Sequence, residues 1–367
     1  MKKLFFIIND LEGGGAEKVT VEYVNNLVET YDVTLFLLKN SGVHLKAVDA
    51  KVKIVYALHK EEKLSKNMGK VIMRALKYSK NMDTVIGALE FIPTYIAFFV
   101  GKIRKIPTIG WVHTNLNVNT SIYNKWDVKI SRFIYNRLSR IISVSEGVKE
   151  SIVDVFKIKN TQNIITIYNP FNLDKIIKLS CEKDEMVEES TPYILAVGRL
   201  IPEKGFDILI DAFKELKKDT SFTRKLIILG EGPERDKLKE QVENLRLEEN
   251  VFLIGYKENP YTWIKNADLF VLSSRLEGLP SVLIEALILQ TSIVSFDCLS
   301  GPSEILEDGE YGVLVKNINY NDLSEKIKFA LSKDNQLKIS SEKMRTRANE
   351  FTTLKSISKF EKVLSQL

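Results

Sequence analysis

The chain has 367 residues, of which 44% are hydrophobic and 28% are charged. This composition is typical of a soluble globular protein, and the content of 18 Gly and 2 Cys excludes a collagen-like chain and a disulfide-stapled small fold. The net charge of +5 is too mild to indicate a nucleic-acid partner.

The first apolar run follows two lysines, as in a signal peptide, but it stops at Asn9-Asp10 and no small-residue cleavage site follows. We therefore expect a first β-strand and a cytoplasmic protein. The longest apolar run, Phe91–Val100, is half of the ~20 residues that span a bilayer. Cys181 and Cys298 are isolated, and no Cys or His has metal-ligand spacing, so no metal site is expected.

In the first half, short apolar runs alternate with amphipathic stretches. The expected strands are Leu4–Ile8, Val33–Leu38, Val52–Tyr56, Thr84–Ala88, Thr108–Val112, Ile141–Val144 and Ile164–Ile167. The expected helices are Ala16–Val28, Glu90–Lys102, Lys129–Leu138 and Val148–Phe156. The alternation predicts a parallel sheet that is covered on both faces.

The second half repeats this alternation. Its expected strands are Tyr193–Val197, Leu226–Leu229, Val251–Ile254, Leu269–Leu272 and Ile293–Phe296. Its expected helices are Phe206–Leu216, Glu234–Leu245, Ser281–Leu289 and Asp322–Leu331. Two such halves predict two doubly wound domains. We expect an N-terminal domain over residues 1–171, a linker with an acidic stretch over 172–191, a C-terminal domain over 192–349, and a helix over 350–367 that returns to the first domain.

Doubly wound sheets bind ligands beyond the carboxyl ends of their strands, so we examined the turns there. The first turn contains Gly13-Gly14-Gly15 ahead of an expected helix. Glycine amides and a helix N-terminus attract an anion such as phosphate. The spacing is not the dinucleotide G-x-G-x-x-G, and a flexible turn is an equal alternative.

Two turns of the second half combine glycine with charge. Gly198–Gly205 offers Arg199 and Lys204, which suit a diphosphate, unless both are ordinary solvated cations. Gly230–Pro233 (GEGP) allows a close backbone approach, with a plain tight turn as the alternative.

The most specific motif is Glu277–Ser281 (EGLPS) with Glu285. Because Pro280 suits the first helical position, Glu277 is expected on a loop and Glu285 inside the helix. The loop carboxylate suits sugar hydroxyls and the helical one a ribose. The turn Gly301–Ile305 (GPSEI) is expected beside this motif, where it suits a sugar or phosphate, and a Pro-initiated helical turn is the alternative.

Together these motifs resemble those of the retaining GT-B glycosyltransferases of family 4. The matching residues are Gly14–Glu17, Gly198–Leu200 with Lys204 and Gly205, Gly230–Pro233, Glu277–Ser281 with Glu285, and Gly301–Ile305. The resemblance covers nearly the whole chain and is stronger in the second half. It implies an α/β fold of the GT-B type, in which two Rossmann-like doubly wound domains face a cleft. The nucleotide-sugar donor would bind the C-terminal domain and the acceptor the N-terminal one.

The resemblance also implies residue roles. Arg199 and Lys204 would hold the donor diphosphate and stabilise the leaving group. Glu277 would contact hydroxyls of the donor sugar, and His113, after the strand Thr108–Val112, would lie beside that sugar. A hydrogen-bonded structural histidine is the alternative for His113. Further donor-binding residues would be Gly14, Gly15, Gly198, Gly230, Gly278, Leu279, Pro280, Glu285 (for the ribose), Ser303, Glu304 and Ile305. No cofactor is implied, because the nucleotide sugar is a substrate, and the resemblance implies no metal, because cationic side chains and helix N-termini would take its place on the diphosphate.

One feature is particular to this chain. Lys63, Lys66, Lys70, Arg74 and Lys77 recur at three- and four-residue spacing beside an apolar stripe. This pattern is typical of an interfacial helix at an anionic membrane, and a solvated face of a domain helix is the alternative. Residues 1–170 contain 25 Lys and Arg against 15 Asp and Glu, a balance of +10, whereas residues 171–367 contain 28 against 33. The imbalance favours a protein peripheral to the membrane.

We therefore expect a retaining glycosyltransferase that moves a hexose or N-acetylhexosamine from a nucleotide sugar, with UDP as the expected nucleotide. The acceptor would be a saccharide in cell-surface polysaccharide, lipopolysaccharide or lipid-linked glycan synthesis. Two alternatives are a UDP-N-acetylglucosamine 2-epimerase of the same fold and a non-catalytic nucleotide-sugar-binding protein.

Overall fold

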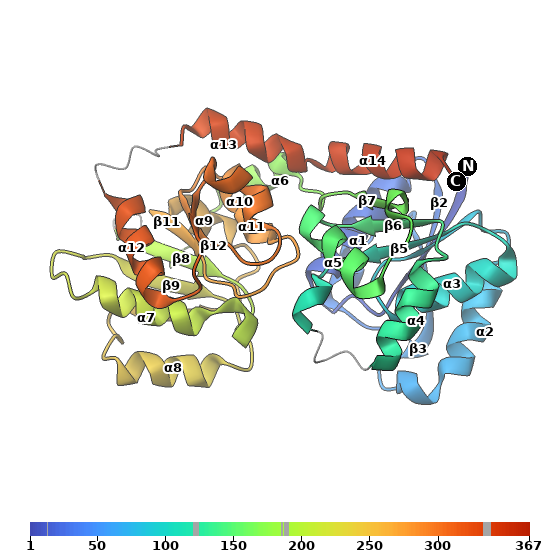
Figure 1. The fold of residues 1–367 in the computed structure, drawn as a ribbon, viewed down its shortest axis with the longest axis horizontal. Coiled ribbons are helices and arrows are strands. Elements are labelled where there is room, and N and C mark those ends of the chain that lie inside the picture. The colour runs from blue at the N-terminus through green and yellow to red at the C-terminus, as the bar shows by residue number, and fades with distance from the viewer. Residues whose placement is uncertain (13, 120–124, 185, 187–190, 333–338) are drawn as a thin grey trace. The chain divides into compact units, whose positions relative to one another are not determined.

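A computed structural model describes residues 1–12, 14–119, 125–184, 186, 191–332 and 339–367. The chain forms two compact units (Figure 1). The first unit contains Met1–Pro170 together with Thr353–Leu367, and the second contains Phe171–Thr352. The C-terminal segment is therefore part of the first unit.

Within the described residues, the first unit is built on seven parallel strands in the order β3-β2-β1-β4-β5-β6-β7. The strands are β1 (Lys3–Ile8), β2 (Asp32–Asn40), β3 (Lys53–His59), β4 (Thr84–Gly87), β5 (Thr108–Val112), β6 (Arg140–Ser143) and β7 (Ile164–Thr166). The helices are α1 (Gly15–Leu27), α2 (Met68–Tyr78), α3 (Ile92–Arg104), α4 (Lys125–Tyr135), α5 (Glu146–Phe156) and α14 (Thr353–Ser365). The central strands read as continuous apolar runs because both faces of the sheet are covered.

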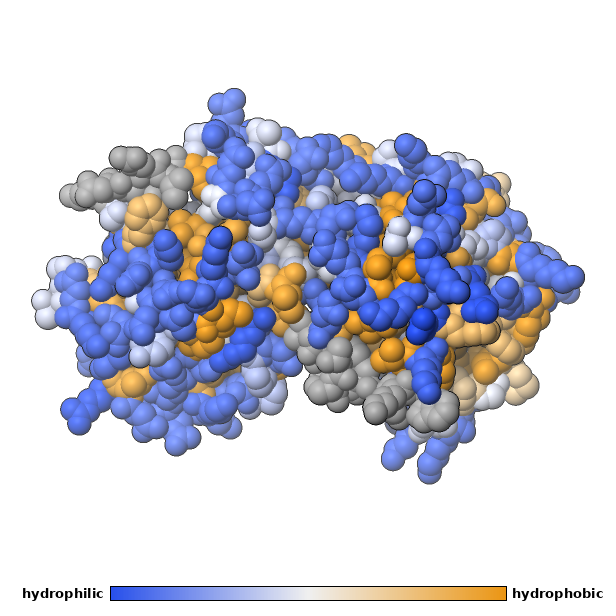
Figure 2. Space-filling view, viewed as in Figure 1, coloured by the Kyte–Doolittle hydropathy of each residue, from blue (hydrophilic) through white to orange (hydrophobic). Residues whose placement is uncertain are grey.

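Aromatic side chains tie α14 into the first unit. Phe360 of α14 stacks on Phe6 and Trp111, with ring centroids 6.1 and 5.5 Å away, and Tyr23 of α1 meets the edge of Trp111 at 4.6 Å. Such aromatic pairs contribute about 0.5–1.5 kcal/mol beyond the area that they bury. Outside this core, the visible surface is largely hydrophilic (Figure 2).

Within its described residues, the second unit has six parallel strands in the order β10-β9-β8-β11-β12-β13. The strands are β8 (Tyr193–Val197), β9 (Lys225–Leu229), β10 (Val251–Gly255), β11 (Leu269–Leu272), β12 (Ile293–Phe296) and β13 (Val313–Val315). The helices are α6 (Leu173–Leu179), α7 (Phe206–Leu216), α8 (Arg235–Asn244), α9 (Tyr261–Asn266), α10 (Ser281–Ile288), α11 (Pro302–Ile305), α12 (Tyr320–Leu331) and α13 (Ser341–Ala348).

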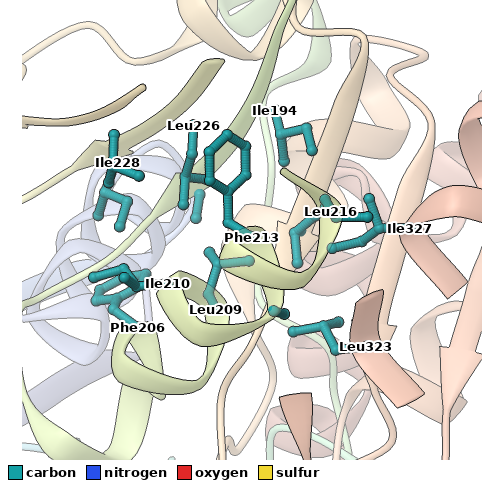
Figure 3. Packing of buried hydrophobic residues seen from close by; sticks show 14 of the residues in the cluster. Ile194, Phe206, Leu209, Ile210, Phe213, Leu216, Leu226, Ile228, Leu323 and Ile327 are labelled. Atoms are coloured by element: carbon teal, nitrogen blue, oxygen red, sulfur yellow. The ribbon is translucent and has the colours of Figure 1, made fainter. Parts of the chain in front are cut away.

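A hydrophobic core cluster of the second unit lies between the sheet and the helices α7, α8 and α12. Leu209 and Phe213 of α7 point toward Leu226 of β9, and Leu323 and Ile327 of α12 complete the cluster (Figure 3). All five side chains are buried. Each buried side chain of this size contributes about 1.5–3 kcal/mol through removal of apolar surface from water. This packing gives the strand ends a fixed scaffold.

The prediction of two doubly wound α/β domains is confirmed. The expected linker and the basic stretch both differ from the expected elements. Part of the range 172–191, which was expected as a linker, forms α6 and packs against α9 and α10 in the second unit. The basic stretch Lys63–Lys80 is not one helix, because a 3-10 turn over Leu64–Lys66 precedes α2.

Both sheets reverse their strand order at one point, between β1 and β4 in the first unit and between β8 and β11 in the second. Ligands of doubly wound folds bind beyond the carboxyl ends of the strands at such a switch point. The turns after β1 and β4 therefore define the candidate ligand-binding edge of the first unit, and the turns after β8 and β11 define that of the second unit.

Candidate active site

An ion pair lies at the switch point of the second unit. Lys204 comes from the turn after β8 and Glu277 from the segment after β11, and Lys204 Nζ donates to Glu277 Oε1 at 2.6 Å. Their side chains are only 22% and 9% exposed. Two of the residues expected to be catalytic, 73 positions apart in sequence, are thus brought into contact.

The Lys204 turn is shaped by Gly205. Its φ of 63° is in the left-handed region, and a Cβ there would lie 2.1 Å from the Ser273 carbonyl oxygen. Ser273 Oγ also donates to the Lys204 carbonyl at 2.9 Å. Only glycine permits this approach, which holds the Lys204 backbone against the segment that carries Glu277.

Arg199 differs from Lys204 in its surroundings. Its side chain is exposed and has no hydrogen bond or ion pair to any residue that the structure describes. Behind it, Gly230 has a φ of 144°, and a Cβ there would lie 1.8 Å from the Gly198 carbonyl oxygen. The Gly198 amide donates to Leu229 O at 2.9 Å. Gly198 and Gly230 therefore let two strand ends meet beside a free guanidinium.

The Glu277 loop leads directly into α10. Pro280 was expected as the first helical residue, but it is the N-cap of α10, and the helix begins one position later, at Ser281. Leu279 is buried, and Glu285 lies inside α10 with 5% of its surface exposed. The expected placement of Glu277 on a loop and Glu285 in the helix is confirmed.

The fifth turn lies beside this loop, as expected. A Cβ on Gly301 would lie 2.4 Å from Pro280 Cδ, and Ser300 Oγ donates to the Glu277 carbonyl at 2.7 Å. The alternative of a Pro-initiated helical turn also holds, since α11 starts at Pro302.

The polar groups of α11 are partly engaged within the protein. Ser303 Oγ bonds to Asp308 Oδ1 at 2.6 Å, and the Ile305 amide donates to Gly301 O at 2.7 Å. The carbonyls of Glu304 and Ile305 accept from Arg347, which is 7% exposed. Arg347 could not be predicted from the sequence, because the two carbonyls that it bonds are 43 and 42 positions away.

Cys298 is a buried neighbour of the ion pair. Burial foremost, and then the nearby Glu277 carboxylate, raise the pKa of the Cys298 thiol to about 12. A thiol with such a pKa is not a nucleophile at neutral pH. Cys298 therefore packs against the site without offering covalent chemistry.

In the first unit, His113 follows β5 directly. Burial lowers the pKa of His113 to about 4, against a hydrogen bond with the Ala88 backbone. Its Nε2 is buried and has no partner among the described residues. The imidazole is therefore neutral at physiological pH, and Nε2 is an available hydrogen-bonding atom.

Glu90 lies at the end of the turn that follows β4, and the sequence did not indicate it as a candidate site residue. Its carboxylate accepts from the His113 amide at 3.2 Å and from Thr114 Oγ1 at 2.8 Å. Burial raises the pKa of Glu90, although these two hydrogen bonds oppose the shift. A single acid after a short strand gives no sequence signal, because the partners come from the next strand turn.

Gly14 and Gly15 start α1, with Gly14 as its N-cap. A Cβ on Gly14 would lie 2.1 Å from Glu17 Oε2, so the Glu17 carboxylate folds back over Gly14. No atom lies near the Cβ position of Gly15. An acid at this position stabilises the helix N-terminus. Gly13 lies outside the described residues.

The basic stripe is partly used by the fold. Lys70 Nζ donates to Glu62 Oε1 at 2.6 Å, and Arg74 donates to the carbonyls of Tyr56 and Ala57. Lys63, Lys66 and Lys77 are exposed. Among the described residues, no cluster of His, Cys, Asp and Glu has the arrangement of a metal site, and no helix is long and apolar enough to cross a membrane.

Comparison with known proteins defines the class. The family model described as "Glycosyltransferase Family 4" matches residues 13–175, and the one described as "Glycosyl transferases group 1" matches residues 180–351. An N-acetylgalactosamine-N,N'-diacetylbacillosaminyl-diphospho-undecaprenol 4-alpha-N-acetylgalactosaminyltransferase of Campylobacter jejuni is 31% identical, over 97% of both chains.

Solved structures agree on the fold. HepE of Anabaena in complex with UDP and glucose superposes with a TM-score of 0.85 at 18% identity, over 100% of both chains. The lipopolysaccharide outer core galactosyltransferase WaaB gives 0.76 at 20% identity, again over 100% of both chains. The chain belongs to the GT-B glycosyltransferases of family 4, and it is an enzyme of that class.

Proposed function

We propose that this enzyme is a retaining transferase of a hexose or N-acetylhexosamine from a UDP-sugar to a saccharide in bacterial cell-surface glycan synthesis. The observation that carries the proposal is the Lys204–Glu277 pair at the switch point of the second unit, beside the free Arg199. The Campylobacter relative is named for a diphospho-undecaprenol-linked acceptor, and HepE was solved with UDP and glucose. A lipid-diphosphate-linked saccharide is therefore the proposed acceptor.

The proposed chemistry is electrostatic. Departure of the nucleotide leaves negative charge on the diphosphate, and Arg199 and Lys204 would stabilise that charge where it develops. Glu277 would accept hydrogen bonds from hydroxyls of the donor sugar, and Glu285 from the ribose. In the mechanism that the family resemblance implies, a diphosphate oxygen takes the proton of the acceptor hydroxyl on the same face, so no metal is required.

The first unit supplies two proposed contacts, both from the family resemblance. The amides of Gly14 and Gly15 would bind the diphosphate, and the neutral His113 would contact the donor sugar. The buried, unpartnered Nε2 of His113 supports this role, because a buried polar atom costs about 1–3 kcal/mol when it has no hydrogen bond.

A transfer assay tests the proposal. The enzyme is incubated with UDP-linked hexoses and N-acetylhexosamines and with a saccharide on a lipid diphosphate, and NMR reads the anomeric configuration of the product. Transfer with retained configuration is the expected result. Transfer with inversion would contradict the mechanism. Conversion of the donor sugar without an acceptor would indicate the 2-epimerase, and donor binding without turnover a binding protein.

We also propose that the first unit contacts an anionic membrane. Figure 2 shows hydrophobic and hydrophilic residues mixed over the part of the first unit where Figure 1 places the helices α2, α3 and α4. The large apolar residues that are exposed on the adjoining helices α2, α3 and α4 are Met73, Ile92, Phe99, Ile103, Ile130 and Phe133. The exposed cations around them are Lys77, Lys102, Lys129, Arg132 and Arg137. Exposed apolar side chains and cations on the same helices fit an anionic lipid surface.

A further inference from the structure

The segment that carries Glu277 also carries Arg275. Arg275 forms hydrogen bonds with residues that precede Lys204 in sequence and with one that follows it. The Arg275 backbone amide donates to Glu203 O at 2.8 Å, and its Nη1 donates to Pro202 O at 2.7 Å. Its guanidinium also bonds both oxygens of Asp207, in the first turn of α7, at 2.8 and 2.6 Å. Arg275 thus contacts the residues before and after Lys204.

Arg275 and Asp207 each stabilise the charged form of the other. The Asp207 carboxylate raises the pKa of Arg275 through its hydrogen bonds. Burial alone would raise the pKa of Asp207, but the hydrogen bonds and charge of Arg275 lower it below its ordinary value. The two-pronged geometry is the one in which an Arg–carboxylate pair fixes direction as well as distance.

The exposure of the pair argues against a role in global stability. The side chains of Arg275 and Asp207 are 37% and 41% exposed. Ion pairs with such exposure contribute little to the stability of the fold, because water and salt screen them. The contacts do fix one local quantity, the placement of the Lys204 turn against the Glu277 segment.

We infer that Arg275 and Asp207 are positioning residues for the donor site, an inference that rests on the proposed function. They hold the two segments so that the Lys204 ammonium and the Glu277 carboxylate present one fixed spacing to the diphosphate and sugar. Positioning errors of about 1 Å are costly in enzymes, since charge stabilisation depends on fixed donors. Neither residue needs to touch the substrate.

The chain offers a matched control. Arg224 Nε donates to Asp268 Oδ2 at 2.6 Å, and these side chains are 31% and 34% exposed. This pair lies in the same unit, but its residues precede β9 and β11, at the amino ends of the strands. Arg224→Lys therefore removes the guanidinium of an Arg–Asp pair of similar exposure, joined through one nitrogen, at the opposite edge of the sheet.

The experiment compares kcat/KM for the donor and the thermal midpoint in single and double variants. Arg275→Lys and Asp207→Asn are expected to lower kcat/KM by about 10-fold or more, with thermal midpoints like that of Arg224→Lys, whose activity stays at the wild-type level. In the double variant of Arg275→Lys and Lys204→Ala, the loss is expected to equal that of Lys204→Ala alone. Non-additivity identifies a residue that acts through another.

Two results would overturn the inference separately from the proposed function. Independent, additive losses in the double variant, or an activity loss that only follows a lowered thermal midpoint, would make Arg275 a structural residue while Lys204 stays in the site. If Lys204→Ala itself turned over the donor like the wild type, the proposed site would be wrong, and the inference would fail with it.

Discussion

At the scale of single residues, Arg199 and Lys204, the two cations expected to bind the diphosphate, differ in whether they have an ion-pair partner. Lys204 forms an ion pair with Glu277, whereas the Arg199 guanidinium has no partner among the described residues. A free, always-charged fork beside a glycine turn suits a diphosphate. The role of Arg199 is therefore the more direct one to test by substitution.

We predict that Arg199→Ala lowers kcat/KM for the donor by about 10²–10³-fold, the usual effect of removing one group that stabilises charge in the transition state. Arg345→Ala, which removes an exposed arginine from α13, is the control and should leave kcat/KM unchanged. Steady-state kinetics measures both. An Arg199→Ala enzyme with wild-type kcat/KM would show that Arg199 does not bind the diphosphate.

His113 predicts a pH dependence of stability. Its pKa is about 4 in the folded protein, against an ordinary value of 6.5. Below pH 6.5 this imidazole binds a proton in the unfolded chain but not in the folded one. The contribution of His113 to stability therefore falls as the pH drops from 6.5 to 4, and it levels off below pH 4. His113→Gln should remove roughly 1–3 kcal/mol of this loss.

Urea unfolding at pH 7 and at pH 4.5 measures this difference. His59→Gln, which changes an exposed histidine, serves as the control and should keep the wild-type dependence. An identical pH dependence in the wild type and in His113→Gln would show that His113 titrates normally.

At the scale of elements, the glycine turns between strands and helices determine the site. The left-handed φ of 144° at Gly230 and its approach to Gly198 leave no room for a side chain. Gly230→Ala is expected to destabilise the protein by at least about 2 kcal/mol, through strain and the displacement of the backbone. Gly69→Ala in α2, where no atom lies near the Cβ position, should instead be neutral or stabilise by ~0.5–1 kcal/mol.

Thermal unfolding distinguishes the two glycine variants, since about 1 kcal/mol shifts the midpoint by roughly 2–4 °C in a domain of this size. A Gly230→Ala midpoint equal to that of the wild type would mean that the β8 and β9 turns tolerate separation.

The elements with strong periodicity were predictable. The bounds of β5, β8 and α7 match the expected ones, because each is an apolar run or stripe with clear ends. The short β13 and α9 were missed, since three to six residues carry too little periodicity. The helix α13 is polar, and its place is set by packing against α10.

The site followed the same division. Glycine, proline and acid spacing indicated the turns, and within the second unit the strand order brought the turns after β8, β11 and β12 together. Arg275, Asp207 and Glu90 were not predictable, because their meaning lies in partners that only the fold supplies. A turn can be predicted from its own short sequence. A contact between residues that are far apart in sequence depends on the strand order, which the local sequence does not reveal.

At the scale of the whole molecule, charge is divided unevenly along the chain. Residues 1–170 have a balance of 25 − 15 = +10 and residues 171–367 of 28 − 33 = −5. We predict that the protein floats with vesicles containing anionic lipid at low salt and is released as salt rises. Phe133→Ser should weaken flotation, whereas Tyr256→Ser, at an exposed aromatic of the second unit, should not. The absence of flotation at low salt would contradict the membrane proposal.

The proposed function requires that the second unit binds the nucleoside diphosphate of a UDP-sugar. The most direct measurement is the thermal midpoint with UDP, GDP, ADP and TDP, each with and without EDTA. A ligand of the folded state stabilises by about 2.7 kcal/mol at 100 Kd. We predict a rise with UDP that EDTA does not change and that Arg199→Ala and Glu285→Ala reduce. A rise with another nucleotide alone, or a UDP effect that EDTA abolishes, would contradict it.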